Sequence, residues 1–408
     1  MGPLENLTIV EMCGPLGEYA AKLLGDMGAN VIKVELPTGS PSREIGPFVD
    51  DIPGPNRSLN FFYHNTNKRS VVLDYRNSEE DRNLLLDLIH EADLVIEDHV
   101  PDDLPSLGIQ YEEIAKRNTG LLWCSITPYG LDGPWSQYGA SDMTALAAGG
   151  PMSMNGYSPE DVPDAPPIHG KGDLAYKTAS HYAVIGILVA LRHRLKSGEG
   201  QLIDCSMHEA LSSTTEVGLP YWLYTGKNIL RQTSRHASVQ RTDPWQFPTA
   251  DEKYILVFGT GRSAESWLDF KKWLQNDGFG LQLDDARFDD PLARQGGRGT
   301  TESKEINSEL AKFIASKSAE EIYRGAQDRR LPWGTVREPH EILEDNHFRS
   351  RGHIVSVSIS DENKEHEMPG APYHLSSTPW ELRLPAPELG EHTDDVLGDL
   401  QDNSLRDR

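Results

Sequence analysis

Short apolar runs alternate with amphipathic segments through the first half of the chain. Runs typical of β-strands occupy residues 7–12, 30–35, 69–75, 93–98 and 120–126. Between them, residues 18–28 and 79–92 carry apolar side chains at helical spacing, and the first of these segments ends at a glycine. Short apolar strands that alternate with helices are typical of a parallel sheet covered on both faces. The pattern therefore predicts an α/β fold with a large Rossmann-like domain.

A further strand is expected at residues 202–207, and after it the regular alternation of strands and helices ends. From about Thr225 onward, amphipathic helices are expected at residues 265–275 and 303–316, and a strand at residues 254–261. We therefore predict that the N-terminal part of the large domain covers residues 1–212 and that a smaller α+β domain covers residues 228–330.

Net charge and cysteine content limit which kinds of molecule the protein can be expected to bind. The formal net charge of −24 argues against nucleic-acid binding, which needs a basic surface, but it does not exclude one small anionic ligand. The three cysteines lie far apart, which suits a reducing compartment and provides no metal-ligand spacing. The N-terminus lacks a secretory layout, and no run of about 18 apolar residues occurs. We therefore expect a cytoplasmic protein with neither a membrane nor a metal partner.

The glycine loop after the first expected strand can be compared with the pattern of a dinucleotide-binding site. The loop reads CGPLGEY, with glycines at Gly14 and Gly17. The G-x-G-x-x-G pattern needs a glycine where Leu16 stands, so a nicotinamide or flavin site is not expected. Two interpretations remain: a glycine loop whose helix N-terminus suits an anion, and a plain strand-to-helix turn.

A second glycine-framed turn holds one carboxylate. The stretch HGKGDLAYKTA places Asp173 directly before a long apolar run. Asp173 could be a helix N-cap that accepts the N–H of Ala175 or Tyr176. It could also be a nucleophile that a substrate can reach. The capping-box partner is missing, because Tyr176 stands where Glu or Gln would be. Both interpretations stay open on the residues alone.

Five motifs together resemble a known family. In chain order they are VEMCGPLGEYAAKLLGDMGANVIKVELPTGSPSR, NTNKRSVVLDYR, SITPYGLDGPW, the segment GDLAYKTASHYAVIGILVALRHRLKSGEGQLIDCSMHEA, and PAPELGEHTDDVL. This series resembles the class III CoA-transferases of the formyl-CoA transferase and carnitine-CoA transferase type over nearly the whole chain. The resemblance implies that residues 338–408 return to the large domain and form its C-terminal tail. It also implies that two chains interlock in a homodimer.

The resemblance implies an activity as well. A class III CoA-transferase moves CoA from an acyl-CoA donor to a free carboxylic acid, so CoA is part of the substrate and no tightly bound cofactor is expected. Asp173 would form a mixed anhydride with the acyl group and then an aspartyl-CoA thioester. Gly170 and Gly172 would let the substrate approach and would expose backbone N–H groups to the developing oxyanion.

The same resemblance indicates which residues contact CoA. The expected contacts are Pro15, Leu16, Leu73, Arg76, Asp98, His99 and Asp142. Arg76 could bind phosphate or adenine, or it could be a solvated charge at a strand end. Asp142 could orient the substrate or only cap the helix that follows it. The other local cations are Lys68, Arg69 and Arg43, whereas Ser106 stands where the family usually has a basic residue.

Two other functions compete with CoA transfer. The α-methylacyl-CoA racemases of the same superfamily need a histidine in a G-H-D-x-x-Y segment as a second proton-transfer group. Here Ser141 replaces that histidine and Ala145 replaces the tyrosine, which disfavours a racemase. A CoA-ester binding protein without turnover is the third possibility, and the intact Asp173 with its glycines argues against it.

Overall fold

The computed structural model describes residues 2–215, 218–235, 238–259, 261, 263–294, 299–359 and 365–401. Contacts between Cα atoms divide the chain into two compact units. The first unit comprises Met1–Gly149, Gly170–Thr214 and Asp345–Arg408, and the second comprises Gly150–His169 and Thr215–Glu344. The domain boundaries expected from the sequence stay a prediction.

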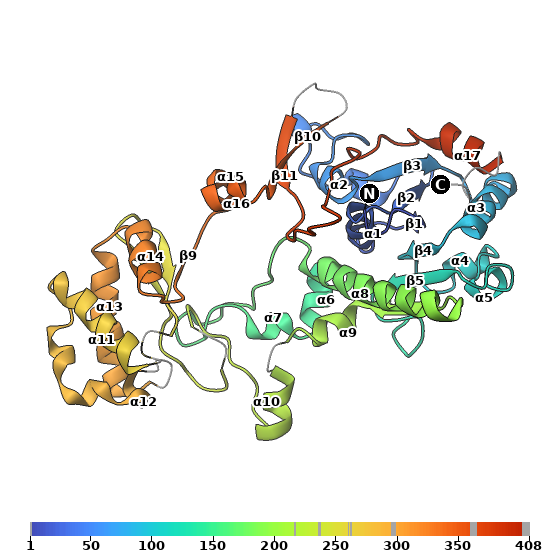
Figure 1. Ribbon diagram of the computed structural model, residues 1–408. Coiled ribbons are helices and arrows are strands. Elements are labelled where there is room, and N and C mark those ends of the chain that lie inside the picture. Colours follow the sequence, from blue (N-terminus) through green and yellow to red (C-terminus); the bar gives the residue numbers. More distant parts are fainter. Residues whose placement is uncertain are drawn as a thin grey trace. The chain divides into compact units, whose positions relative to one another are not determined.

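A parallel sheet forms the centre of the first unit (Figure 1). Among the described residues its six strands follow the order β3-β2-β1-β4-β5-β6, and every neighbouring pair is parallel. The strands are β1 (Thr8–Met12), β2 (Asn30–Glu35), β3 (Lys68–Val72), β4 (Leu94–Glu97), β5 (Leu122–Thr127) and β6 (Leu202–Ser206). The order changes direction between β1 and β4, as in a Rossmann sheet. The predicted α/β fold is therefore confirmed.

Helices cover both faces of this sheet. Alternate residues such as Val10 and Val95 face a core that includes Leu85 and Leu88 of α3 (Glu79–Glu91), together with Val396. The opposite set of alternate residues faces the other side. On that side, α8 (Leu174–Ser197) contacts β5, β6 and α1 (Glu18–Asp26). Burial on both faces explains why these strands are almost continuously apolar.

Helix α8 is the central helix of the first unit. It is 24 residues long, and Ala175, Ala179 and Ala183 are buried at a spacing of four residues. Its length and mean hydropathy of 1.4 over 18 residues would also let it cross a membrane, but the core helix of a soluble protein passes the same test. It contacts β5 and β6, and 39% of that 18-residue window is buried.

The C-terminal segment closes one edge of the sheet. β3 is an edge strand, and it bonds to residues more than 300 positions away. The N–H of Val72 donates to Oγ1 of Thr393 at 3.0 Å, and the N–H of His392 donates to the carbonyl oxygen of Ser70 at 3.0 Å. Helix α17 (Thr393–Gln401) then contacts β3 and α3. The edge is thus covered, which protects its free backbone groups from other strands.

Smaller elements complete the two units. In the first unit, β10 (Ile354–Ser358) pairs antiparallel with β11 (Glu365–Pro369). In the second unit, an antiparallel sheet is formed by β7 (Gln246–Pro248), β8 (Tyr254–Leu256) and β9 (Gly334–Thr335). Its main helices are α11 (Ala264–Asn276), α13 (Thr301–Ala315) and α14 (Ala319–Asp328). Trp267, Phe270 and Phe313 lie in the core of this unit.

Candidate functional site

A cavity of about 480 Å³ lies at the carboxyl ends of the parallel strands in the first unit. The loops after β1, β3 and β4 all contribute to its lining, so it lies at the point where the strand order reverses. Crevices at this point are where open α/β sheets usually bind ligands. The predicted contacts that line the cavity are Pro15, Leu16, Arg76, Asp98 and His99. By contrast, Leu73 is 2% exposed and belongs to the hydrophobic core.

Asp98 holds the loop between β1 and α1. One carboxylate oxygen accepts the N–H of Gly14 at 2.9 Å, and the other accepts the N–H groups of Gly14 and Gly17 at 3.0 Å. Burial raises the pKa of Asp98 to about 6, although the two N–H donors and His99 act in the opposite direction. The side chain of Asp98 therefore serves as a cap for the start of α1, which has no side-chain cap of its own among the described residues.

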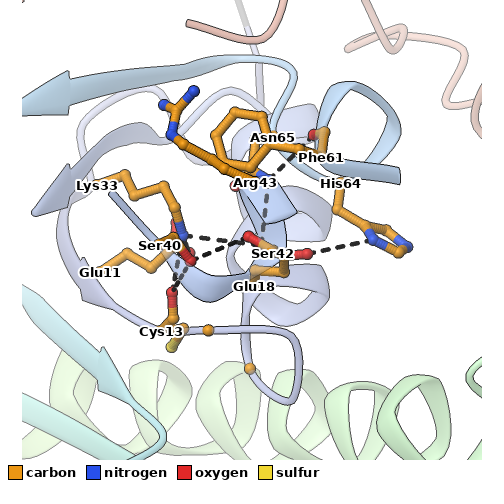
Figure 2. A network of polar contacts seen from close by, with 12 residues as sticks. Glu11, Cys13, Glu18, Lys33, Ser40, Ser42, Arg43, Phe61, His64 and Asn65 are labelled. Atoms are coloured by element: carbon orange, nitrogen blue, oxygen red, sulfur yellow. Dashed lines mark hydrogen bonds and ion pairs between the residues drawn. The ribbon is translucent and has the colours of Figure 1, made fainter. Parts of the chain in front are cut away.

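Buried charged side chains contact the same loop, and Figure 2 shows Lys33 and Glu11 beside Cys13. Nζ of Lys33 donates to Oε1 of Glu11 and to the carbonyl oxygen of Cys13, both at 2.8 Å. Nζ of Lys68 donates to the carbonyl oxygen of Glu18 at 2.8 Å and pairs with Oε2 of Glu11 at 2.8 Å. Both lysine side chains are 0% exposed. The two lysines therefore hold the carbonyl groups at either end of the loop that carries Pro15 and Leu16.

Neighbouring opposite charges favour the charged forms of Lys33 and Glu18. Burial alone would lower the pKa of Lys33, but Glu11, Glu18 and Glu35 raise it above its ordinary value. Burial alone would raise the pKa of Glu18, but hydrogen bonding to His64 and the charges of Lys33 and Lys68 lower it to about 2. Sequence reasoning missed this network. Its signal was a charge in the middle of each of two apolar strands, since Glu11 and Lys33 are register partners.

Arg43 and Lys68, two of the local cations noted in the sequence, form buried ion pairs inside the protein. Arg43 is 1% exposed, and its Nε and Nη2 donate to the two oxygens of Glu35 at 2.7 and 2.8 Å. Its guanidinium carbon also lies 3.8 Å from the centre of the Phe61 ring. Lys68 is buried as described above. Neither side chain can therefore reach a phosphate at the surface.

Arg76 and His99 remain as the basic side chains that line the described cavity wall. Among the described lining residues Arg76 is the one Lys or Arg, and it makes two hydrogen bonds to Asp103 at 2.9 and 2.6 Å. Burial would lower the pKa of His99, but hydrogen bonding to Glu97 and the nearby carboxylates raise it. Nε2 of His99 lies 3.2 Å from the hydroxyl of Tyr75. The cavity thus offers an anionic ligand the charge of Arg76 and, when His99 is protonated, a second positive charge.

Asp173 occupies the N-cap position of α8 but does not cap the helix. Its backbone is left-handed, with φ 55° and ψ 44°, and its side chain makes no capping hydrogen bond. Within the described part of the chain, its carboxylate accepts no hydrogen bond and forms no ion pair. The capping interpretation of Asp173 is therefore wrong. Its αL backbone differs from the extended backbone that is usual at an N-cap.

Asp142 supplies the missing cap. Oδ1 of Asp142 accepts the N–H of Ala175, in the first turn of α8, at 2.7 Å. Asp142 itself begins α6 (Asp142–Ala148), and Ser141 caps that helix through a capping box with Thr144. The side chain of Asp142 thus caps α8 rather than the helix that follows it in sequence.

Tyr176 connects the nucleophile candidate with the cavity. Tyr176 lines the cavity and lies one helical turn after Asp173. Burial raises the pKa of its hydroxyl, and the charges of Asp142, Asp173 and Asp98 raise it further. The structure thus gathers three acidic residues from three separate segments around one tyrosine. Gly172 has φ 95°, and a Cβ built on it would meet no described atom within 4 Å, which leaves the turn open on this side.

Comparisons with known proteins agree with this arrangement. Residues 4–393 match the profile described as CoA-transferase family III. The chain is 31% identical to the succinyl-CoA:(R)-benzylsuccinate CoA-transferase subunit BbsE of Thauera aromatica. The aligned region covers 95% of this chain and 92% of that protein. It is also 30% identical to the succinate–glutarate CoA-transferase of Agrobacterium fabrum. That alignment covers 98% of this chain and 96% of the relative. A CaiB/BaiF family protein from Brucella suis has a similar structure, with a TM-score of 0.80, 27% identity and coverage of 98% of this chain and 99% of that one. The chain therefore belongs to CoA-transferase family III.

Proposed function

We propose that the protein transfers CoA from an acyl-CoA to a free carboxylic acid through a thioester on Asp173. The observation that carries this proposal is the carboxylate of Asp173, which is left without a partner among the described residues while Asp142 caps α8. A carboxylate that bonds to nothing else keeps its lone pairs for a substrate. Family membership supports a CoA-transferase but does not by itself choose the nucleophile.

The reaction would exchange partners in balanced steps. A carboxylate oxygen of Asp173 attacks the carbonyl carbon of the acyl-CoA thioester, and the C–S bond breaks. The acyl group is now joined to Asp173 as a mixed anhydride, and CoA is released as a thiolate. The thiolate then attacks the aspartyl carbonyl, which releases the donor acid and leaves an aspartyl-CoA thioester. The acceptor carboxylate attacks this thioester, and the same steps run in reverse. The overall reaction exchanges one thioester for another, and the covalent intermediates divide a difficult exchange into easier steps.

Local structure supports the approach of a thioester to Asp173. The left-handed Gly172 has open space where a side chain would be, so the acyl group can reach the turn. The N-terminus of α8, which is the positive end of the helix dipole, lies beside Asp173. Backbone N–H groups of Gly170 and Gly172 are the donors that we assign to the oxyanion.

The rest of CoA would lie along the cavity. We assign the pantetheine arm to the loop with Pro15 and Leu16, which Asp98 and the buried lysines hold in place. Arg76 and His99 would then meet the phosphates. Two relatives are named for succinyl-CoA or succinate, so we propose succinyl-CoA as the donor and a dicarboxylic acid as the acceptor.

We also propose that the working form is an interlocked homodimer in the cytoplasm. Apolar side chains on one side of α8 support an assembly: Ile185 is 58% exposed and Val189 is 65% exposed in the single chain. One relative is named as a subunit, so a second, different chain is the competing partner. Native mass spectrometry of the purified chain distinguishes the two. A homodimer mass supports the proposal, and a monomer at micromolar concentration contradicts it.

Label exchange between succinyl-CoA and free acids tests the chemistry. We expect transfer by the unaltered protein, and we expect one aspartyl-CoA adduct per active site, detectable by mass spectrometry and cleaved by hydroxylamine. Asp173→Ala should abolish both the exchange and the adduct. Asp87→Ala, an exposed aspartate of α3, is the matched control and should change neither. Exchange that persists in Asp173→Ala would overturn the proposal.

A further inference from the structure

We propose that Asp142 is a positioning residue for the nucleophile. By capping α8 from another helix, it keeps the carboxylate of Asp173 turned away from the helix and available to the substrate. This inference rests on the proposed role of Asp173 and assigns a separate, indirect role to Asp142.

Other helices of the chain show what an N-cap residue ordinarily does. The side chains of Ser58, Ser78, Ser206, Ser263, Thr300, Ser318 and Asp345 each accept an N–H from the first turn of the helix that they begin. Asp173 has one of the best side chains for this purpose, yet it does not cap α8. The first turn of α8 instead meets Asp142, which lies 33 positions from Ala175 in sequence.

Backbone geometry shows why the two roles exclude each other. An N-cap residue usually has extended backbone angles, which point its side chain back at the first turn. The seven residues above have φ between −121° and −69°. Asp173 instead has φ 55°. A nucleophile that must face a substrate therefore cannot also satisfy the N–H groups of its own helix.

The energies involved are of similar size, so Asp142 can decide the outcome. A left-handed conformation is unfavourable for a residue other than glycine. The loss of a helix cap is unfavourable by a comparable amount. Without Asp142, the N–H of Ala175 would lack an acceptor, and Asp173 could relieve its own strain and cap the helix in one rotation. The carboxylate would then bond to the backbone at the expense of its attack on the thioester.

The neighbouring helix shows the same arrangement. α1 also begins beside the cavity, and Asp98, 81 positions away, accepts the N–H of its N-cap residue Gly17. α1 and α8 contact each other. Both helices thus begin at the candidate site and take their caps from carboxylates elsewhere in the chain. The residues of these turns are left to face the ligand.

Asp142→Ala and Asp142→Asn together test the inference. Asparagine caps helices about as well as aspartate, because its side-chain oxygen accepts the same hydrogen bond. We expect Asp142→Ala to slow kcat and the single-turnover formation of the aspartyl-CoA adduct about 10- to 100-fold, with KM for the acyl-CoA nearly unchanged. Asp142→Asn should restore both rates to within about threefold of the unaltered protein.

Ser78→Ala is the matched control for stability. It removes the cap of α3, a hydrogen bond to the N–H of Asp81 at 3.1 Å, and should lower the unfolding temperature about as much as Asp142→Ala. We expect its adduct formation to stay normal, which separates positioning from a general loss of stability.

Three results would overturn the inference: full speed in Asp142→Ala, equal losses in Asp142→Asn and Asp142→Ala, or an equal loss in Ser78→Ala. If Asp142→Ala does not fold, Asp142→Asn alone decides, because a large loss there would show that the charge of Asp142 is needed and not its capping. Exchange that survives in Asp173→Ala would instead contradict the proposed function itself.

Discussion

The carboxylate of Asp98 accepts the backbone N–H of Gly17 at 3.0 Å and so joins the end of β4 to the start of α1. Oδ1 of the same side chain accepts the N–H of Gly14 at 2.9 Å. A Cβ built on Gly17 would lie 2.6 Å from Sγ of Cys13, so the loop passes too close for any larger residue. The conformation of this loop, and with it the placement of Pro15 and Leu16, therefore depends on Asp98.

The burial of Asp98 predicts an unusual pH dependence of stability. Burial raises the pKa of Asp98 from 3.8 to about 6, so between these values the folded protein binds a proton that the unfolded chain releases. Stability from this group is therefore present at low pH and is lost as pH rises through about 6. Relative to Asp98→Asn, the unaltered protein should lose about 2–3 kcal/mol of unfolding free energy between pH 4 and pH 7.

The relevant measurement is how the difference in unfolding free energy between the unaltered protein and Asp98→Asn changes with pH. The size of that difference at a single pH is not informative. Asparagine cannot accept the N–H of Gly17 with its amide nitrogen, so Asp98→Asn carries a constant penalty. Thermal unfolding of both proteins at half-unit steps from pH 4 to pH 7 separates the two contributions, and the ionisation of Glu18 cancels in the difference. A difference that stays constant over this range would contradict the raised pKa.

The ion pair between Arg76 and Asp103 predicts a gain of affinity by mutation. If Arg76 binds a CoA phosphate, it must give up at least part of its two hydrogen bonds to Asp103. Asp103→Asn should therefore lower KM for the acyl-CoA about three- to tenfold at low salt, and Arg76→Ala should raise it by a similar factor. Steady-state kinetics at 20 mM and 300 mM salt would check both. An unchanged KM in both variants would show that Arg76 is only a solvated charge.

The buried pair between Lys33 and Glu11 predicts a large loss of stability. Lys33→Met leaves the carboxylates of Glu11 and Glu18 with one cation fewer in a site closed to water. We expect the variant to lose about 3–5 kcal/mol of unfolding free energy. The double variant Lys33→Met/Glu11→Gln should lose less than the sum of the single losses, because it removes one charge of each sign.

Lys116→Met is the control for this pair. Lys116 pairs with Glu113 at the surface, where the two side chains are 65% and 63% exposed, so its loss should cost under about 0.5 kcal/mol. Denaturant unfolding of the unaltered protein, Lys33→Met, Glu11→Gln, the double variant and Lys116→Met compares the five proteins directly. Equal small effects for Lys33→Met and Lys116→Met would mean that the buried network is not needed for stability.

The closed edge of β3 predicts the effect of a change near the C-terminus. Thr393→Val keeps the size of the side chain but removes the oxygen that accepts the N–H of Val72 at 3.0 Å. The variant should lose about 1–2 kcal/mol, because a half-buried donor is left without its acceptor. Thr119→Val, at an exposed threonine, is the control and should be neutral. A normal unfolding midpoint for Thr393→Val would mean that the edge does not need this contact.

The sequence by itself determined the class of fold and the family. Apolar runs that alternate with helical segments require a parallel sheet, because such strands must be buried on both faces. The resemblance to the family pointed to Pro15, Leu16, Arg76, Asp98 and His99, which follow strands, where a parallel sheet gathers its loops. These features depend on neighbours in the chain, which is why they could be predicted.

Only the tertiary structure decided what each charged residue does. Arg43 and Lys68 look like surface cations in sequence, but ion pairs from other strands bury them. Asp173 looks like a helix cap, but a carboxylate 31 positions earlier in the chain, that of Asp142, does the capping. A hydrogen bond or a buried ion pair depends on atoms that meet only after the sheet has formed. Partners distant in sequence therefore settle which carboxylate is used by the fold and which is left for chemistry.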